Sequence, residues 1–122
     1  MKNLVLAVSV MTFAASVVGL TSSNASAGAY CGRAPASDID HSDYVTADAN
    51  TKIHTGSDVD CTAVGLLSAG QRADYYCYTI NPSSNLTWTY LRDVATGKKG
   101  WVRDDTLPKV NNQHGSGVYC GF

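Results

Sequence analysis

The fold class is decided by the stretch TWTYLR at residues 87–92 and by GWVR at residues 100–103, which follows it across a short turn. In an extended strand, successive side chains point to opposite faces. Leu91 therefore faces one way, whereas Trp88 and Tyr90 face the other. Thr-Gly-Lys-Lys at 96–99 turns the chain back. The pattern predicts an antiparallel pair of strands at residues 86–94 and 100–103.

Short apolar runs broken by turn-forming residues continue through the rest of the chain beyond Tyr44. A third strand is predicted over residues 72–79, with Tyr76 and Tyr78 on one face and Tyr75 and Cys77 on the other. Residues 104–107 predict a tight turn that leads into a short closing strand. No segment of helical length has apolar residues that recur every three or four positions, as an amphipathic helix requires. We therefore predict an all-β fold with little helix.

The first 27 residues have the composition of a cleavable signal peptide. Lys2 precedes an apolar run at 4–20, a polar segment follows, and Ala25-Ser26-Ala27 provides the small side chains that signal peptidase requires. An uncleaved anchor is the alternative, but a run of 17 residues is at the lower limit for crossing a bilayer. We predict cleavage after Ala27, secretion, and no membrane attachment of the mature protein.

Composition limits the remaining 95 residues to one small domain. The whole chain has a formal net charge of -1, and its densest basic stretch, Lys98-Lys99 with Arg103, is followed at once by Asp104 and Asp105. Nucleic-acid binding requires clustered Lys and Arg to displace counterions. We therefore expect no nucleic-acid partner, and we expect a monomer.

The four cysteines all follow the predicted cleavage site, and an even number in a short exported chain indicates two disulfides. Zinc is the alternative, but the chain has no Cys-x-x-Cys pair and no ligand-type histidine spacing. Three pairings are open. We favour Cys61 with Cys77, which would join neighbouring strands, and Cys31 with Cys120, which would tie the two ends of the mature chain together.

The ordered motifs from residue 44 to residue 107 resemble bacterial SH3-type (SH3b) domains. TWTYLR, the Thr96-Gly97 turn and GWVRDDTL at 100–107 resemble the end of such a domain, NTKIHTG at 50–56 resembles its opening strand, and VGLL at 64–67 with Gly70-Gln71 resembles its middle passage. Cys61 together with DYYCY at 74–78 is similar to small secreted SH3 proteins of actinobacteria.

This resemblance implies a small SH3-like five-stranded barrel over residues 44–108. An extended arm at 28–43 would precede the barrel, and a disulfide-tied extension at 109–122 would follow it. The core residues that the resemblance implies are Val64, Leu66, Leu91, Val102 and Leu107. Trp88 occupies the position of the family's groove Trp, but Arg103 and Thr106 stand where a groove Pro and Tyr are expected, so the match to a Pro-rich peptide groove is partial.

The aromatic residues are the first candidate site. They could form a platform for a sugar or peptide, because rings stack on apolar faces and their polar tips fix orientation. Packing under the loops is the alternative. Trp88 and Tyr90 are the leading candidates, because strand alternation directs both away from Leu91 and toward the surface. The predicted ligand-binding set is Trp88, Tyr90, Tyr76, Tyr78, Trp101 and His54.

Two other chemistries receive little support from the sequence. Asp38, Asp40 and Asp43 beside His41 could attract a cation, but the segment lacks the glycine and the bidentate acid of a calcium loop, so we predict a solvated arm without metal. Nucleophilic catalysis needs a free Cys or an activated Ser, and the chain has no Gly-x-Ser-x-Gly elbow. We expect no enzyme activity and no cofactor.

These expectations favour a secreted, non-enzymatic SH3-like module that binds cell-wall peptide or glycan. The alternative is a secreted protein-interaction module, such as an inhibitor or effector subunit, which would present the loops at 54–60 and 81–86 on a disulfide-bonded scaffold. The partner would then be peptidoglycan in the first case, and a surface or secreted protein in the second.

Overall fold

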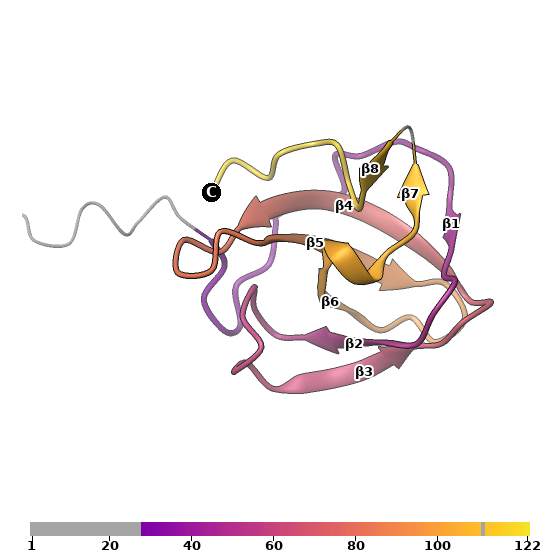
Figure 1. Ribbon diagram of the computed structural model, residues 1–122, viewed down its shortest axis with the longest axis horizontal. Helices are drawn as coiled ribbons and strands as arrows, with labels where there is room; N and C mark the ends of the chain where they lie inside the picture. Colours follow the sequence, from indigo (N-terminus) through magenta and orange to yellow (C-terminus); the bar gives the residue numbers. More distant parts are fainter. Residues whose placement is uncertain (1–27, 111) are drawn as a thin grey trace, which may run out of the picture.

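The computed structural model describes residues 28–110 and 112–122 (Figure 1). The predicted signal peptide at 1–27 lies outside the described residues. Within the described residues the chain is built from strands and one turn of 3-10 helix, Asp104–Thr106, so the all-β prediction is confirmed. The strands are β1 (Val45–Thr46), β2 (Thr51–His54), β3 (Ala63–Leu67), β4 (Arg72–Ile80), β5 (Thr87–Asp93), β6 (Lys99–Arg103), β7 (Lys109–Val110) and β8 (Gln113–His114).

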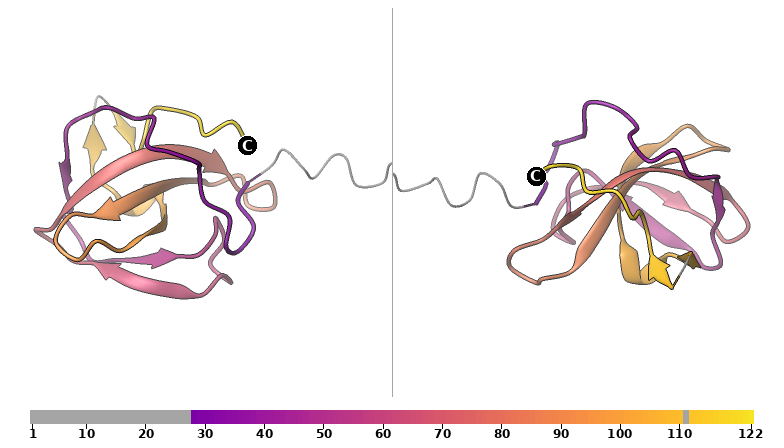
Figure 2. Two further views of the ribbon diagram at one scale, coloured as in Figure 1. Left: turned by 180° about the vertical axis from the view of Figure 1, so that it is seen from behind. Right: turned by 90° about the horizontal axis from the view of Figure 1, so that it is seen from above.

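Six of these strands form one antiparallel sheet in the order β1-β4-β5-β6-β2-β3, and β7 and β8 form a separate ribbon. The sheet is strongly bent, as the two views in Figure 2 show. Its hydrogen bonding does not close into the predicted five-stranded barrel, because β1 and β3 form two edges. β1 contributes only two residues, Val45 and Thr46, and both pair with β4.

A bulge in β4 changes which face of the sheet this strand helps to bury. Tyr75 pairs with Leu91 but Cys77 pairs with Tyr90, so Tyr76 is the extra residue between them. Buried residues alternate along β4 on either side of the bulge. Tyr75 therefore belongs to the same core as Leu91, whereas Cys77 lies on the face that carries Tyr90.

The structure consequently has a core on each face of the β5–β6 hairpin. The first is the interior of the bent sheet and contains Ala47, Ile53, Leu67, Ala73, Tyr75, Leu91, Val102 and Leu107. The second lies on the opposite face and contains Ala29, Trp88 and Trp101, with Tyr90, Cys120 and Phe122 packed against them. Segments from both ends of the described chain, 29–33 and 120–122, therefore cover the outer face of the hairpin.

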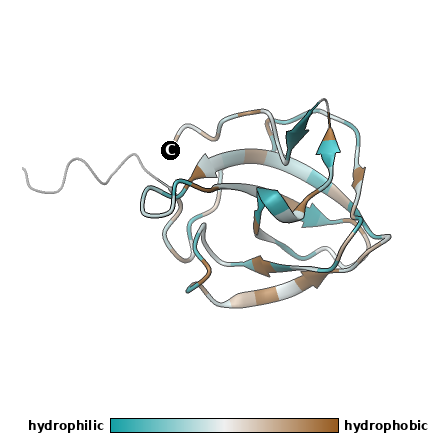
Figure 3. Cartoon of the chain, in the orientation of Figure 1, coloured by the Kyte–Doolittle hydropathy of each residue, from teal (hydrophilic) through white to brown (hydrophobic). Residues whose placement is uncertain are grey.

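The predicted core is right for Leu91, Val102 and Leu107, which are buried, and wrong for Val64 and Leu66. Val64 and Leu66 lie on the edge strand β3 and are 37% and 49% exposed. In β3 the inward position near the turn is Leu67, which is fully buried opposite Thr51. The apolar colouring of β3 at the edge of the sheet is visible in Figure 3.

The two disulfides join Cys31 to Cys61 and Cys77 to Cys120, so the favoured pairing was wrong. Cys31 reaches Cys61 because the N-terminal segment pairs with the loop after β2: Ser57 N donates to Ala29 O at 2.9 Å, and Gly32 N donates to Thr55 O at 2.8 Å. Cys120 reaches Cys77 because the C-terminal segment runs beside β4, where Tyr119 bridges Tyr78.

The two cross-links indicate an oxidising, extracellular environment. The described segments contain no helix that is long and apolar enough to span a bilayer.

Candidate functional site

Three of the predicted site residues form a continuous aromatic row across the outer face of the sheet. Tyr76 and Tyr90 have ring centroids 5.4 Å apart, and Tyr90 and Trp101 lie 5.2 Å apart in an edge-on arrangement. Phe122 extends the row beyond Trp101 at 6.0 Å, and the Arg33 guanidinium lies 3.7 Å from the centroid of the Phe122 ring. This row is mainly packing, because Trp101 is fully buried and Tyr90 is half-buried.

The predicted surface position of Trp88 is wrong, since its side chain is only 1% exposed. Strand alternation places it on the outer face of β5, as predicted, but the segment around Ala29 covers that face. The His54 ring meets it edge-on with centroids 5.5 Å apart. Tyr78 lies apart from the row and packs on Tyr119 at 5.5 Å.

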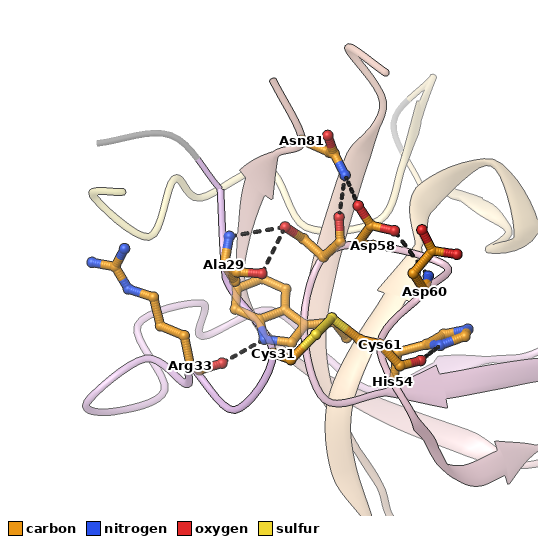
Figure 4. Close-up of a disulfide and its surroundings, with 10 residues drawn as sticks. Ala29, Cys31, Arg33, His54, Asp58, Asp60, Cys61 and Asn81 are labelled. Atoms are coloured by element: carbon orange, nitrogen blue, oxygen red, sulfur yellow. Dashed lines mark hydrogen bonds between the residues drawn. A yellow bond between two sulfur atoms is a disulfide. The ribbon is translucent and has the colours of Figure 1, made fainter. Parts of the chain in front are cut away.

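A cleft of about 790 Å³ lies instead between the N-terminal segment and two loops, beside the disulfide drawn in Figure 4. We call it the arm–loop cleft, and its walls come from segments 28–33, 57–61 and 81–83. The Asn81 side chain holds the two loops together, because its Nδ2 donates to Ser57 O at 2.7 Å and to Asp58 Oδ2 at 3.2 Å. These are the loops that the sequence indicated as presented surfaces.

The N-terminal wall of the cleft is fixed by a hydrogen bond and by a disulfide. Ala29 N donates to Ser57 Oγ at 2.8 Å, and the Cys31–Cys61 disulfide ties the segment covalently to the same loop. Gly56 makes this close approach possible, since a Cβ there would lie 2.7 Å from the Cys61 sulfur and 2.8 Å from Ala29 O. The cleft is therefore preorganised.

Charged and aromatic groups of different kinds face the arm–loop cleft. Tyr30 is 70% exposed at its rim, and Arg33 lies 5.4 Å from the centroid of the Tyr30 ring. Asp58 and Asp60 line the other side. Asp58 Oδ1 already accepts from Asp60 N at 2.8 Å. Such a mixture of a ring, a cation and carboxylates can stack on, and hydrogen-bond to, a polar ligand with both donors and acceptors.

Sequence reasoning assigned the loops to this surface but missed Tyr30 and Arg33. Both belong to a segment that has no strand periodicity, and it was interpreted as an extended arm. The one local signal was that an aromatic residue, Tyr30, and a basic residue, Arg33, lie close to Cys31 in the sequence. That signal carries little weight until the disulfide partner is known.

A second polar feature, a buried chain of hydrogen bonds, holds the C-terminal segment over the sheet. Thr89 Oγ1 donates to Asp104 Oδ1 at 2.5 Å, Ser116 N donates to Thr89 Oγ1 at 2.9 Å, and Ser116 Oγ donates to Asp40 Oδ2 at 2.5 Å. Two buried carboxylates therefore lie at the ends of this chain of hydrogen bonds: Asp104 in the 3-10 turn and Asp40 in the N-terminal arm.

The two carboxylates respond differently to burial. Burial raises the pKa of Asp104 to about 6, and the hydrogen bond from Thr89 only partly offsets this. Burial also acts to raise the pKa of Asp40, but hydrogen bonds from Ser116 and Ser42 outweigh it, so the pKa of Asp40 is lowered. Within the described segments no group of three or more His, Cys, Asp or Glu side chains is placed to hold a metal ion.

Comparison with protein-family models, curated proteins and solved structures gives no match to this chain.

Proposed function

We propose that this chain is an extracellular, non-enzymatic SH3-like module that binds cell-wall peptide or glycan in the arm–loop cleft. The observation that carries the proposal is the cleft itself. Three segments far apart in the sequence enclose about 790 Å³, and a disulfide and the Asn81 bonds hold them in place. A preorganised, concave surface with a few polar groups is the usual form of a ligand site.

The SH3-like assignment is supported by the order of elements in the second half of the chain. β5, a tight turn, β6 and a 3-10 turn follow one another in a strongly bent antiparallel sheet. Leu91, Val102 and Leu107 fill the interior of that sheet, as the family resemblance implies.

Secretion is supported by the two disulfides, and we propose that the segment 1–27 is a signal peptide cleaved after Ala27. No free cysteine is present in the described residues, where both cross-links occur. Oxidised cysteines of this kind persist outside the reducing cytosol.

The chemistry of the cleft favours a wall ligand over a purely apolar one. Wall peptides and glycans carry amides, hydroxyls and charged groups, and the cleft offers matching partners in Arg33, Asp58 and Asp60. Tyr30 provides an exposed ring on which a sugar face or a peptide can stack.

The test is a pulldown of the disulfide-bonded protein with purified peptidoglycan at low salt. Retention is expected, and the variants Tyr30→Ala and Asp60→Asn should release a large fraction of the bound protein. Tyr44→Ala is the matched control, because Tyr44 is also exposed but does not line the cleft. Failure of the unmodified protein to be retained at low salt would count against the proposed function.

The rival proposal, a secreted protein-interaction module, is favoured by one specific observation. The edge strand β3 presents exposed Val64 and Leu66, and an edge with exposed apolar side chains can accept a strand from another protein. A protein that co-purifies from culture supernatant with the unmodified chain, and is lost with Val64→Lys, would support the rival.

A further inference from the structure

Arg33 brings a guanidinium group to the arm–loop cleft. The centre of this group lies 3.7 Å from the centroid of the Phe122 ring and 5.4 Å from that of the Tyr30 ring. Its Nη1 donates to Gly28 O at 3.4 Å. Tyr30 and Gly28 themselves line the cleft, so the guanidinium, and not only the backbone of Arg33, lies at the cleft wall.

The guanidinium is held in place from both of its ends. The backbone of Arg33 is fixed, because its N donates to Tyr30 O at 2.9 Å and its O accepts from Trp101 Nε1 at 2.7 Å. Packing against Phe122 covers a flat face of the guanidinium and leaves its N–H groups at the edge. Those N–H groups form a fork that matches a carboxylate. Arg33 is therefore a preorganised receptor for a carboxylate.

The opposite side of the cleft carries two carboxylates, Asp58 and Asp60. Asp58 Oδ1 accepts from Asp60 N at 2.8 Å, and Asp58 Oδ2 accepts from Asn81 Nδ2 at 3.2 Å. Both donors are neutral amides, and the Asp60 side chain is exposed. A carboxylate oxygen has two lone pairs and can accept a further hydrogen bond. This side of the cleft can therefore bind a ligand ammonium.

The positive and negative groups of the cleft do not pair with each other. Figure 4 shows Arg33 on one side of the Cys31–Cys61 disulfide and Asp58 and Asp60 on the other. The ion pairs among the described residues lie elsewhere: Arg92 with Asp74, and Arg103 with Asp105. A ligand with one sign of charge would meet a like charge at one end of the cleft, and a neutral glycan would match neither end.

We propose that the arm–loop cleft binds a zwitterionic peptide, whose carboxylate meets Arg33 and whose ammonium meets Asp58 and Asp60. The cleft volume of about 790 Å³ is within the range of sites for ligands of this size. The proposal rests on the proposed function for the choice of site. It narrows the ligand from peptide or glycan to a peptide that carries both charges.

The experiment is an NMR titration of the complete disulfide-bonded protein labelled with 15N, at low ionic strength. The probes are trialanine with both ends free, N-acetyl-trialanine, trialanine amide, and a neutral chitin tetrasaccharide. Dissociation constants come from the amide shift of Ser83, which lines the cleft. Trialanine should bind about tenfold more tightly than either blocked form, because each blocked form loses one charge-assisted hydrogen-bonded pair.

Two variants assign the two ends of the peptide. Arg33→Gln should abolish the preference for trialanine over its amide but keep the preference over the N-acetyl form. Asp60→Asn should lower the preference over the N-acetyl form and leave the other unchanged. Each variant thus retains one preference, which requires a folded cleft.

Matched controls carry the same changes outside the cleft. Arg72→Gln removes a guanidinium that also lies near a ring, 5.4 Å from the centroid of Tyr44, and Asp48→Asn removes an exposed carboxylate. Neither residue lines the cleft, so both preferences should persist.

Equal dissociation constants for the three peptides, preferences that neither variant alters, or tighter binding of the tetrasaccharide than of trialanine would overturn the proposal. The proposed function has a separate readout, because it requires retention on peptidoglycan. If the unmodified protein is not retained but the peptide preferences hold, the zwitterion site stands and the wall is not its source. Retention without these preferences would show that the cleft ligand is not a zwitterion.

Discussion

The indole N–H of Trp101 donates a 2.7 Å hydrogen bond to the carbonyl oxygen of Arg33, 68 positions earlier in the chain. Trp101 lies in the middle of the sheet and is fully buried, whereas Arg33 belongs to the segment that walls the arm–loop cleft. The bond is drawn in Figure 4. It makes the N-terminal segment part of the second core, so the cleft and the stability of the domain depend on the same contacts.

Trp101→Phe tests this dependence. The variant removes the indole donor and leaves Arg33 O without its partner, so the free energy of unfolding should fall by about 1 to 3 kcal/mol in addition to the loss of ring contacts. Amide hydrogen exchange of residues 29–33 should also become faster. Trp88→Phe is the matched control, because its indole has no partner to lose. An equal change in both variants would contradict the role given to the bond.

The disulfide pairing gives a second prediction. Non-reducing peptide mapping should recover Cys31 with Cys61 and Cys77 with Cys120. Replacing either pair by Ala should lower the free energy of unfolding by about 4 kcal/mol, because the closed loops span 30 and 43 residues. Peptides that link Cys61 to Cys77 would contradict the structure.

The buried Asp104 carboxyl predicts a pH dependence of stability. Its pKa in the folded protein is raised to about 6 from 3.8, so the folded state disfavours the charged form. The contribution of Asp104 to the free energy of unfolding is fully present below pH 3.8. It is lost as the pH rises from 3.8 to about 6, and no further change is expected above that pH. The total change is about 3 kcal/mol.

Denaturant unfolding of the unmodified protein and of Asp104→Asn, at pH 4 and pH 8, measures this effect. The Asn side chain can still accept from Thr89 but does not titrate, so the variant should gain about 2.5 kcal/mol relative to the unmodified protein between the two pH values, because the loss has already begun at pH 4. A difference that does not change with pH would show that Asp104 titrates normally.

Gly115→Ala should destabilise the C-terminal segment severely. A Cβ at this position would lie 2.3 Å from Asp104 Oδ1 and 2.4 Å from Thr89 Oγ1, and Gly115 has a φ of +71°. The two atoms belong to the buried hydrogen-bond chain and cannot move apart without breaking it. We expect a loss of several kcal/mol in the free energy of unfolding.

Gly117→Ala is its control, since a Cβ there meets only the end of the Gln113 side chain at 3.1 Å. Thermal unfolding of the two variants compares them directly. If Gly115→Ala melted at a temperature close to that of Gly117→Ala, the turn at Gly115 would be able to accept a Cβ. The hydrogen bonds among Asp104, Thr89 and Ser116 would then not hold this segment rigidly.

The strands themselves were predictable from local pattern. Side chains of opposite character alternate, or turn-forming residues flank the segment, at residues 72–79, 86–94 and 100–103. The strands β4, β5 and β6 lie at these positions. The alternation also placed Trp88 and Tyr90 together on the face opposite Leu91. It could not show that this face is buried, because the cover comes from Ala29 and Phe122, in segments with no periodicity.

Two further features depend on long-range contacts that no local pattern encodes. The run Val-Gly-Leu-Leu at 64–67 has no alternation, so the sequence alone does not distinguish Leu66 from Leu67 as the inward residue, and pairing with β2 decides it. The cysteine pairing depends on which segment runs beside Cys61 and which beside Cys77. Backbone hydrogen bonds determine that: Ala29 O accepts from Ser57 N, while Val118 O accepts from Tyr78 N and Cys120 N donates to Tyr78 O.

The central claim is that the arm–loop cleft binds cell-wall peptide or glycan. Its most direct test is chemical-shift mapping of the 15N-labelled, disulfide-bonded protein with soluble fragments released from purified peptidoglycan. The account predicts that the largest shifts occur at the amides of Tyr30, Asp60 and Ser83, which line the cleft. An unchanged spectrum at high fragment concentration, or shifts confined to residues remote from the cleft such as Tyr44, would contradict it.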